Sequence, residues 1–70
     1  MLTTAPKSIR ENIARAKGYL RRDEVERALV TMSEALRLLA GVKLMRSARA
    51  ELDIQIGEFL GGIVRHSALQ

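Results

Sequence analysis

Few residues in this sequence carry side chains suited to catalysis or metal binding. There is one histidine, His66, and there is no cysteine. An imidazole can act as a general base or a metal ligand near neutral pH. However, His66 has no serine, cysteine or aspartate partner at a recognisable spacing, and a zinc site would need several carboxylates converging on it. We therefore interpret His66 as a surface or interface residue, and we expect neither a metal nor a cofactor.

The hydroxyl and carboxylate side chains do not form a recognisable catalytic pattern either. None of the serines lies in the sharp strand-to-helix motif that presents a nucleophile. They are Ser8, Ser33, Ser47 and Ser67. Most of the carboxylates considered lie three or four residues from a basic side chain, which is typical of ion pairs on a solvated helix. They are Glu24, Glu26, Glu51, Asp53 and Glu58. We expect that the protein is not an enzyme.

Gly57 and Gly61 form a G-x-x-x-G spacing around the charged residue Glu58. The segment lacks the GK[ST] ending of a phosphate-binding loop. It indicates a bend or a tight helix crossing. No run approaches the roughly 18 apolar residues that would span a bilayer, and the first residues lack the apolar stretch of a signal peptide. We expect a cytoplasmic protein with no membrane partner.

The basic residues are unevenly distributed along a chain with a net charge of +4. Residues 7–22 contain six basic side chains and one acid, and residues 37–49 contain four basic side chains and no acid. The latter are candidate nucleic-acid contacts: Arg37, Lys43, Arg46 and Arg49. The chain has only two aromatic residues for stacking on bases, and this junction lacks Asn or Gln to read them. Nucleic-acid binding is therefore the weaker alternative to a protein–protein interaction.

The spacing of apolar residues predicts an all-α fold. Ser8 and Glu11 match a capping box, which predicts a first helix from residue 9. Its apolar face repeats at steps of four, three and four: Ile9, Ile13, Ala16 and Leu20. Asp23, with Glu26 three residues later, predicts the cap of a second helix, and Gly41 suits the left-handed position that ends it. The two helices are expected to pack antiparallel around Ile13, Ala16, Leu20, Ala28, Leu29, Met32 and Leu36.

The third segment, residues 42–67, is expected to form one long helix of about 24 residues, roughly 36 Å in length. Three glycines leave a second reading open, in which residues 43–70 form another hairpin that turns near Gly57. The uninterrupted apolar stripe favours one helix. Such a helix is longer than the hairpin that it must cover, so its stripe is our candidate protein-binding surface. The stripe comprises Leu52, Ile56, Phe59, Leu60 and Ile63.

Residues 9–40 resemble one tetratricopeptide repeat, a helix–turn–helix unit of 34 residues. Five positions carry the resemblance: Ala16, Tyr19, Ala28, Met32 and Ala35. Four positions depart from the common pattern: Asn12, Arg15, Asp23 and Ala40. The resemblance implies a scaffold that binds peptides or helices. Some members of the family hold a C-terminal carboxylate with Lys and Asn, but Ile13 and Lys17 stand at those positions, so that clamp is not supported.

A single repeat buries its faces only against neighbours, and a 70-residue chain without disulfides has a small core. We therefore expect self-association, or membership of a larger array. Residues 67–70 read like a helix that is cut short. The sequence thus predicts a single helical domain, with an arm at residues 1–8, a hairpin at 9–40 and a third helix at 42–67. Its expected role is that of a self-associating adaptor for a protein or peptide partner.

Overall fold

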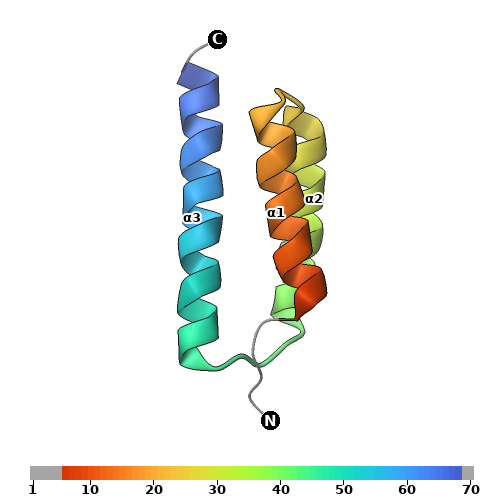
Figure 1. The fold of residues 1–70 in the computed structure, drawn as a ribbon, viewed down its shortest axis with the longest axis vertical. Helices are drawn as coiled ribbons and strands as arrows, with labels where there is room; N and C mark the ends of the chain where they lie inside the picture. The colour runs from red at the N-terminus through yellow and green to blue at the C-terminus, as the bar shows by residue number, and fades with distance from the viewer. Residues whose placement is uncertain (1–5, 69–70) are drawn as a thin grey trace.

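The computed structural model describes residues 6–68, which form three α-helices and no strand. The helices are α1 (Lys7–Arg21), α2 (Val25–Ala40) and α3 (Arg46–Ala68). Helices α1 and α2 form an antiparallel hairpin, and α3 lies beside α1 and runs in the same direction (Figure 1). The expected three-helix architecture is confirmed. The expected arm, residues 1–8, lies mostly outside the described residues, and its last two residues belong to α1.

Helix α1 begins at Lys7, two residues earlier than the capping box predicts. Pro6 occupies the cap position with φ −58° and ψ 145°, and no side chain caps the helix. The backbone N–H of Arg10 donates to the Pro6 carbonyl at 3.3 Å. The prediction that Ser8 caps α1 is therefore wrong, because the extended backbone of Pro6 already supplies the first acceptor.

The turn between α1 and α2 depends on Asp23, which has a φ of 66°. Aspartate tolerates this left-handed conformation better than most residues other than glycine. Asp23 is therefore a turn residue, and the prediction that it caps α2 is wrong: Glu24 holds the cap position, again without a side-chain hydrogen bond. The Glu24 N–H closes the turn by donating to the Tyr19 carbonyl at 2.9 Å. Arg22 and Arg27 flank the turn with guanidinium carbons 5.2 and 5.6 Å from the Tyr19 ring centre.

Helix α2 ends at Ala40, and Gly41 follows as its C-cap without the predicted left-handed conformation. Gly41 has φ −92° and ψ 4°, and its N–H donates to the Leu38 carbonyl at 3.2 Å. The last turn thus tightens with an i→i−3 hydrogen bond, which any residue could make. A short connection then leads to Arg46, so α3 starts four residues later than predicted.

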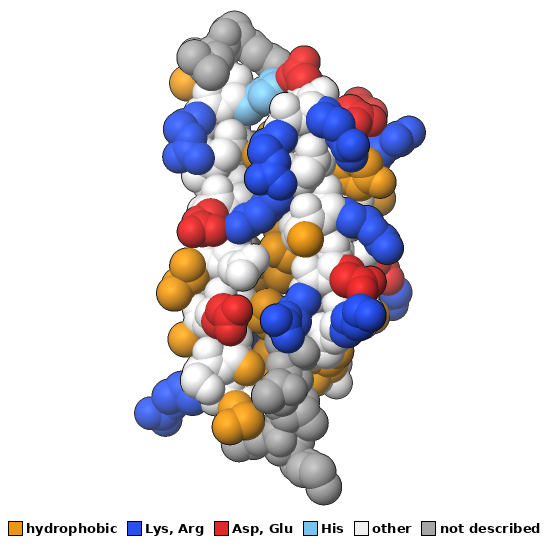
Figure 2. All heavy atoms as spheres, viewed as in Figure 1, with side chains coloured by type: hydrophobic (Ala, Val, Ile, Leu, Met, Phe, Trp, Pro, Cys, Tyr) orange, Lys and Arg blue, Asp and Glu red, His pale blue; other side chains and the backbone are white. Residues whose placement is uncertain are grey.

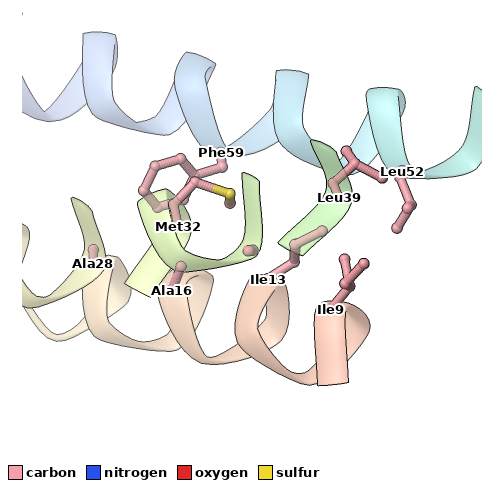
Figure 3. Packing of buried hydrophobic residues seen from close by; sticks show 9 residues of the cluster. Ile9, Ile13, Ala16, Ala28, Met32, Leu39, Leu52 and Phe59 are labelled. Carbon is pink, nitrogen blue, oxygen red and sulfur yellow. The ribbon is translucent and has the colours of Figure 1, made fainter. Parts of the chain in front are cut away.

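The core lies where all three helices meet (Figure 3). Its buried residues are Ile9, Ile13, Ala16, Ala28, Met32, Ala35, Leu39, Leu52 and Phe59. Helix α3 packs mainly on α1. Within residues 6–68 no polar or charged residue is buried, so apolar packing is the main source of stability.

Four of the seven predicted hairpin core residues are confirmed as buried: Ile13, Ala16, Ala28 and Met32. Leu20 is half-buried. The placement of Leu29 and Leu36 in the core is wrong, since each is 44% exposed. They follow Ala28 and Ala35 directly, and successive helix positions are about 100° apart, so they lie on the edge of the buried face.

Helix α3 is continuous, so the reading with a second hairpin is wrong. Gly57, Gly61 and Gly62 all lie inside one helix of 23 residues. A Cβ on Gly62 would lie 2.8 Å from Cδ2 of Leu20, whereas a Cβ on Gly57 would meet nothing within 4 Å. Of these glycines, Gly62 therefore allows α3 to approach α1 closely, as expected for a tight helix crossing.

Candidate interaction surface

Three pairs of residues lie along the line where α1 and the α1–α2 turn meet α3, which we call the α1–α3 contact line. Lys17 Nζ lies 2.7 Å from Glu58 Oε1, Leu20 packs on Gly62, and His66 pairs with Asp23 at the α1–α2 turn. A cleft of about 390 Å³ lies along this line. Its lining residues are Lys17, Leu20, Arg21, Glu58, Phe59, Gly62, Arg65 and His66.

The lining of this cleft has polar groups but no hydroxyl or thiol nucleophile. The pair of His66 and Asp23 could polarise a hydroxyl or thiol group, yet the lining includes no serine, threonine or cysteine. The pair instead joins the C-terminal end of α3 to the α1–α2 turn. His66 is thus an interhelical contact residue in this structure.

A second cleft of about 410 Å³ lies between the N-terminal halves of α1 and α3. It is lined by Arg10, Ala14, Ser47, Ala48, Glu51, Leu52 and Gln55. Ser47 is the only lining hydroxyl group, and the lining has no histidine to act as its base. Across residues 6–68 no three metal-ligating side chains come together. Neither cleft therefore offers a recognisable catalytic arrangement.

The candidate protein-binding stripe on α3 faces mostly inward. Leu52 and Phe59 are 3% and 1% exposed, and Phe59 lies against Met32 of α2 (Figure 3). Ile56 and Ile63 are half-buried against the same core. The expectation that the whole stripe faces a partner needs correction, because α3 folds back on the hairpin and uses this face for its own core. Of the five, Leu60 is well exposed, at 54%.

The exposed apolar side chains of the described residues lie elsewhere. On α2 they are Leu29, Leu36 and Val30, and on α3 they are Ile54, Leu60 and Val64; Met45 precedes α3. Ile54 and Val64 were not among the surface residues predicted from the sequence. A helical projection of α3 would have identified them, since they fall on the side opposite Phe59.

The four candidate nucleic-acid contacts come from three segments: Arg37 from α2, Lys43 from the connection, and Arg46 and Arg49 from α3. Arg37 and Arg49 have carboxylate partners among the described residues. Arg49 Nε lies 3.4 Å from Asp53, and Arg37 donates to both oxygens of Glu34 at 2.6 and 3.0 Å. The hydrogen bond from Arg37 lowers the pKa of Glu34 below its usual value. Such pairing reduces the positive charge that these two residues offer to phosphate groups.

Lys and Arg side chains also spread over the face formed by α1 and α3, where Asp and Glu side chains lie among them (Figure 2). Hydrophobic side chains appear between these charged groups. On this face the charge is therefore mixed rather than a single basic patch.

Comparison of the chain with protein-family models, with curated proteins and with solved structures gives no match. Among residues 6–68, no helix is long and apolar enough to cross a bilayer.

Proposed function

We propose that this protein is a non-enzymatic adaptor that binds a protein or peptide partner through a hairpin resembling a tetratricopeptide repeat, self-associates, and works in the cytoplasm. The observation that carries the proposal is the number of large apolar side chains left exposed on so small a fold. Seven of them, between 44% and 71% exposed, lie on α2, on α3 and just before α3. Such side chains indicate an interaction site where they gather on one face, as Leu29 and Leu36 do on α2.

The partner surface is assigned to α2. Leu29 and Leu36 are seven residues apart, which is about two helical turns, so they lie on the same side of the helix. Both flank Met32, which is buried against Phe59. A second helix laid along α2 could cover these two leucines and extend the existing core. This is the mode in which an amphipathic helix docks through anchors one and two turns apart.

The packing of the hairpin supports the resemblance. Ala16, Ala28 and Ala35 are all 1% exposed or less, so small residues occupy the crossing between α1 and α2. In a repeat array the next helical pair covers the outer face of this crossing. A single repeat leaves such a face uncovered, which is consistent with half-exposed leucines on α2.

The proposal is tested by photocrosslinking at single positions of α2. A photoreactive phenylalanine analogue at Leu36 is expected to give a discrete protein adduct in cells of the source organism. The same analogue at Val30 is the control, because Val30 is 71% exposed and lies about 120° around the helix from Leu36. Replacing Leu29 with serine should reduce the adduct at position 36. Equal adducts at both positions, or none at position 36, would contradict the proposed partner surface.

A further inference from the structure

The outward side of α3 carries a stripe without any charged residue. We define this outer stripe by six positions: Ala50, Ile54, Gly57, Gly61, Val64 and Ala68. They repeat at intervals of four, three, four, three and four residues, which is the spacing of a coiled-coil seam. Ile54 and Val64 are 64% and 68% exposed. Because Gly57 lies roughly opposite Phe59 on the helix, the outer stripe takes no part in the intramolecular core.

The outer stripe can pack closely against another helix. Four of its six residues are alanine or glycine, and small residues let two helix backbones come near each other. A Cβ on Gly57 would meet nothing within 4 Å inside the molecule, so the fold itself does not require glycine there. A glycine in a helix interior costs about 1 kcal/mol relative to alanine, so a packing requirement outside the molecule would explain its presence.

The order of residues in the outer stripe reads the same in both directions. It runs small, large, small, small, large, small from Ala50 to Ala68. We propose that two copies of this chain associate through the outer stripes of their α3 helices, packed antiparallel about a two-fold axis near residue 59. Ile54 of one copy then meets Val64 of the other, and the two glycine positions meet at the centre. This inference deepens the self-association half of the proposed function and rests on it.

The charges beside the outer stripe complement each other in that register. Glu51 and Arg65 follow Ala50 and Val64 directly, so they lie along one edge of the outer stripe. In an antiparallel pair these edges meet, which sets Glu51 of each copy beside Arg65 of the other. Within residues 6–68 neither side chain has an intramolecular ion pair. The two copies of Glu58 also meet on this edge, and within each copy Lys17 Nζ lies 2.7 Å from Glu58 Oε1 and offsets its charge.

A parallel pair fits the same residues less well. It would bring Asp53 of one copy towards Glu58 of the other, and these like charges repel, as the two copies of Glu58 do in the antiparallel pair. It would also separate Glu51 from Arg65 of the partner copy by most of the length of the stripe. The order of the stripe permits the antiparallel pair, and the pairing of Glu51 with Arg65 favours it over the parallel one. Because this charge pattern complements itself, it selects a second copy of this chain as the occupant.

A charge exchange tests the pairing. Glu51 and Arg65 are about 21 Å apart along one helix, so they cannot pair within one copy. Glu51→Arg should weaken the dimer by about tenfold, and the double variant Glu51→Arg/Arg65→Glu should restore it. Light scattering of each variant over a concentration series provides the masses. A double variant that remains as weak as the single one would overturn the proposed register.

Disulfide trapping tests whether the two α3 helices pack antiparallel or parallel. The chain has no natural cysteine, so each disulfide that forms joins two introduced cysteines. Ile54→Cys and Val64→Cys chains, distinguished by a mass tag, are mixed and oxidised. The antiparallel pair predicts mixed 54–64 disulfides with few pairs of identical chains. A dimer that gives mainly 54–54 and 64–64 disulfides would overturn the inference but leave self-association intact. A monomer at every concentration would overturn the inference and the self-association, while the partner surface on α2 is tested separately by its own photocrosslinks.

Discussion

Leu20 of α1 and Gly62 of α3 meet so closely that a Cβ on Gly62 would lie 2.8 Å from Cδ2 of Leu20. This contact fixes the distance between the two helices near the C-terminal end of α1. On one side of this contact Lys17 of α1 pairs with Glu58 of α3. On the other side Asp23, in the α1–α2 turn, pairs with His66 of α3. At this end of α1, helix α3 therefore meets the hairpin through one close apolar contact with a polar pair on each side.

The Leu20–Gly62 contact predicts different effects for two glycine-to-alanine variants. In the monomer, at low concentration, Gly57→Ala should raise the free energy of unfolding by about 0.5–1 kcal/mol, because it removes backbone entropy from the unfolded chain and the added methyl group meets nothing within the molecule. The free energy of unfolding of Gly62→Ala should be about 1 kcal/mol lower than that of Gly57→Ala, because the Leu20 methyl group must move. Urea unfolding followed by circular dichroism measures both. In a Leu20→Ala background the difference between the two variants should vanish, and an unchanged difference would refute the assigned contact.

Phe59 should dominate the docking of α3. It is 1% exposed and packs against Met32, so Phe59→Ala should lower the free energy of unfolding by about 3–5 kcal/mol through the cavity it leaves. The neighbouring Leu60→Ala is the control, with an expected change within about 0.5 kcal/mol, since Leu60 is 54% exposed. Thermal and urea unfolding of the two variants at low concentration provide the comparison. Similar losses for both would mean that α3 does not bury Phe59 in solution.

The Lys17–Glu58 ion pair should contribute modestly and depend on salt. The two atoms are 2.7 Å apart, and the Lys17 side chain is only 25% exposed. A double-mutant cycle with Lys17→Met and Glu58→Gln should give a coupling of about 0.5–1 kcal/mol that falls as salt is raised. The same cycle on Lys7 and Glu11, an i,i+4 pair whose charged atoms are 3.7 Å apart and whose Lys side chain is more exposed, should give a smaller coupling energy. Zero coupling at low salt for the first cycle would contradict the predicted contact.

The Glu34–Arg37 pair predicts a small dependence of stability on pH. Hydrogen bonds from Arg37 lower the pKa of Glu34, so the folded pKa lies below the unfolded one. The stabilisation is therefore present above the unfolded pKa and is lost as pH falls through the folded pKa. In Arg37→Ala, an NMR titration should show the Glu34 pKa returning towards its usual value. Arg27→Ala should leave it unchanged, since Arg27 pairs with Glu24 instead; a similar shift in both variants would rule out the specific pair.

The sequence was sufficient to predict the helices and the inward faces of α1 and α3, because both depend on a period of 3.6 residues. Ile9, Ile13 and Ala16 are spaced by four and three, and they are buried as that period requires. Helix ends were harder to predict. Ser8 and Asp23 both have cap-forming side chains, yet backbone conformations at Pro6 and Asp23 decided where α1 and α2 begin. Pro6 and Asp23 both favour the conformations that they adopt, but the capping motifs do not report backbone conformation.

The candidate surface was predicted less well than the fold. Leu52 and Phe59 lie on an apolar stripe, but the spacing of its residues does not indicate whether a partner or the hairpin covers it. The decision depends on the close approach of Gly62 to Leu20, which is a long-range contact. Leu29 and Leu36 were assigned to the core for a related reason, since the width of the buried face depends on how far α3 extends over α2.

The mass of the protein in solution tests the central claim, that this fold is a self-associating interaction module, most directly. Light scattering coupled to chromatography, run over a wide concentration series, should show the mass rising from 7.8 kDa towards twice that value. Glu51→Arg should shift this rise to higher concentration, and Val30→Ser, which alters an exposed residue of α2, should not. A mass that stays at 7.8 kDa at the highest concentration would contradict the account.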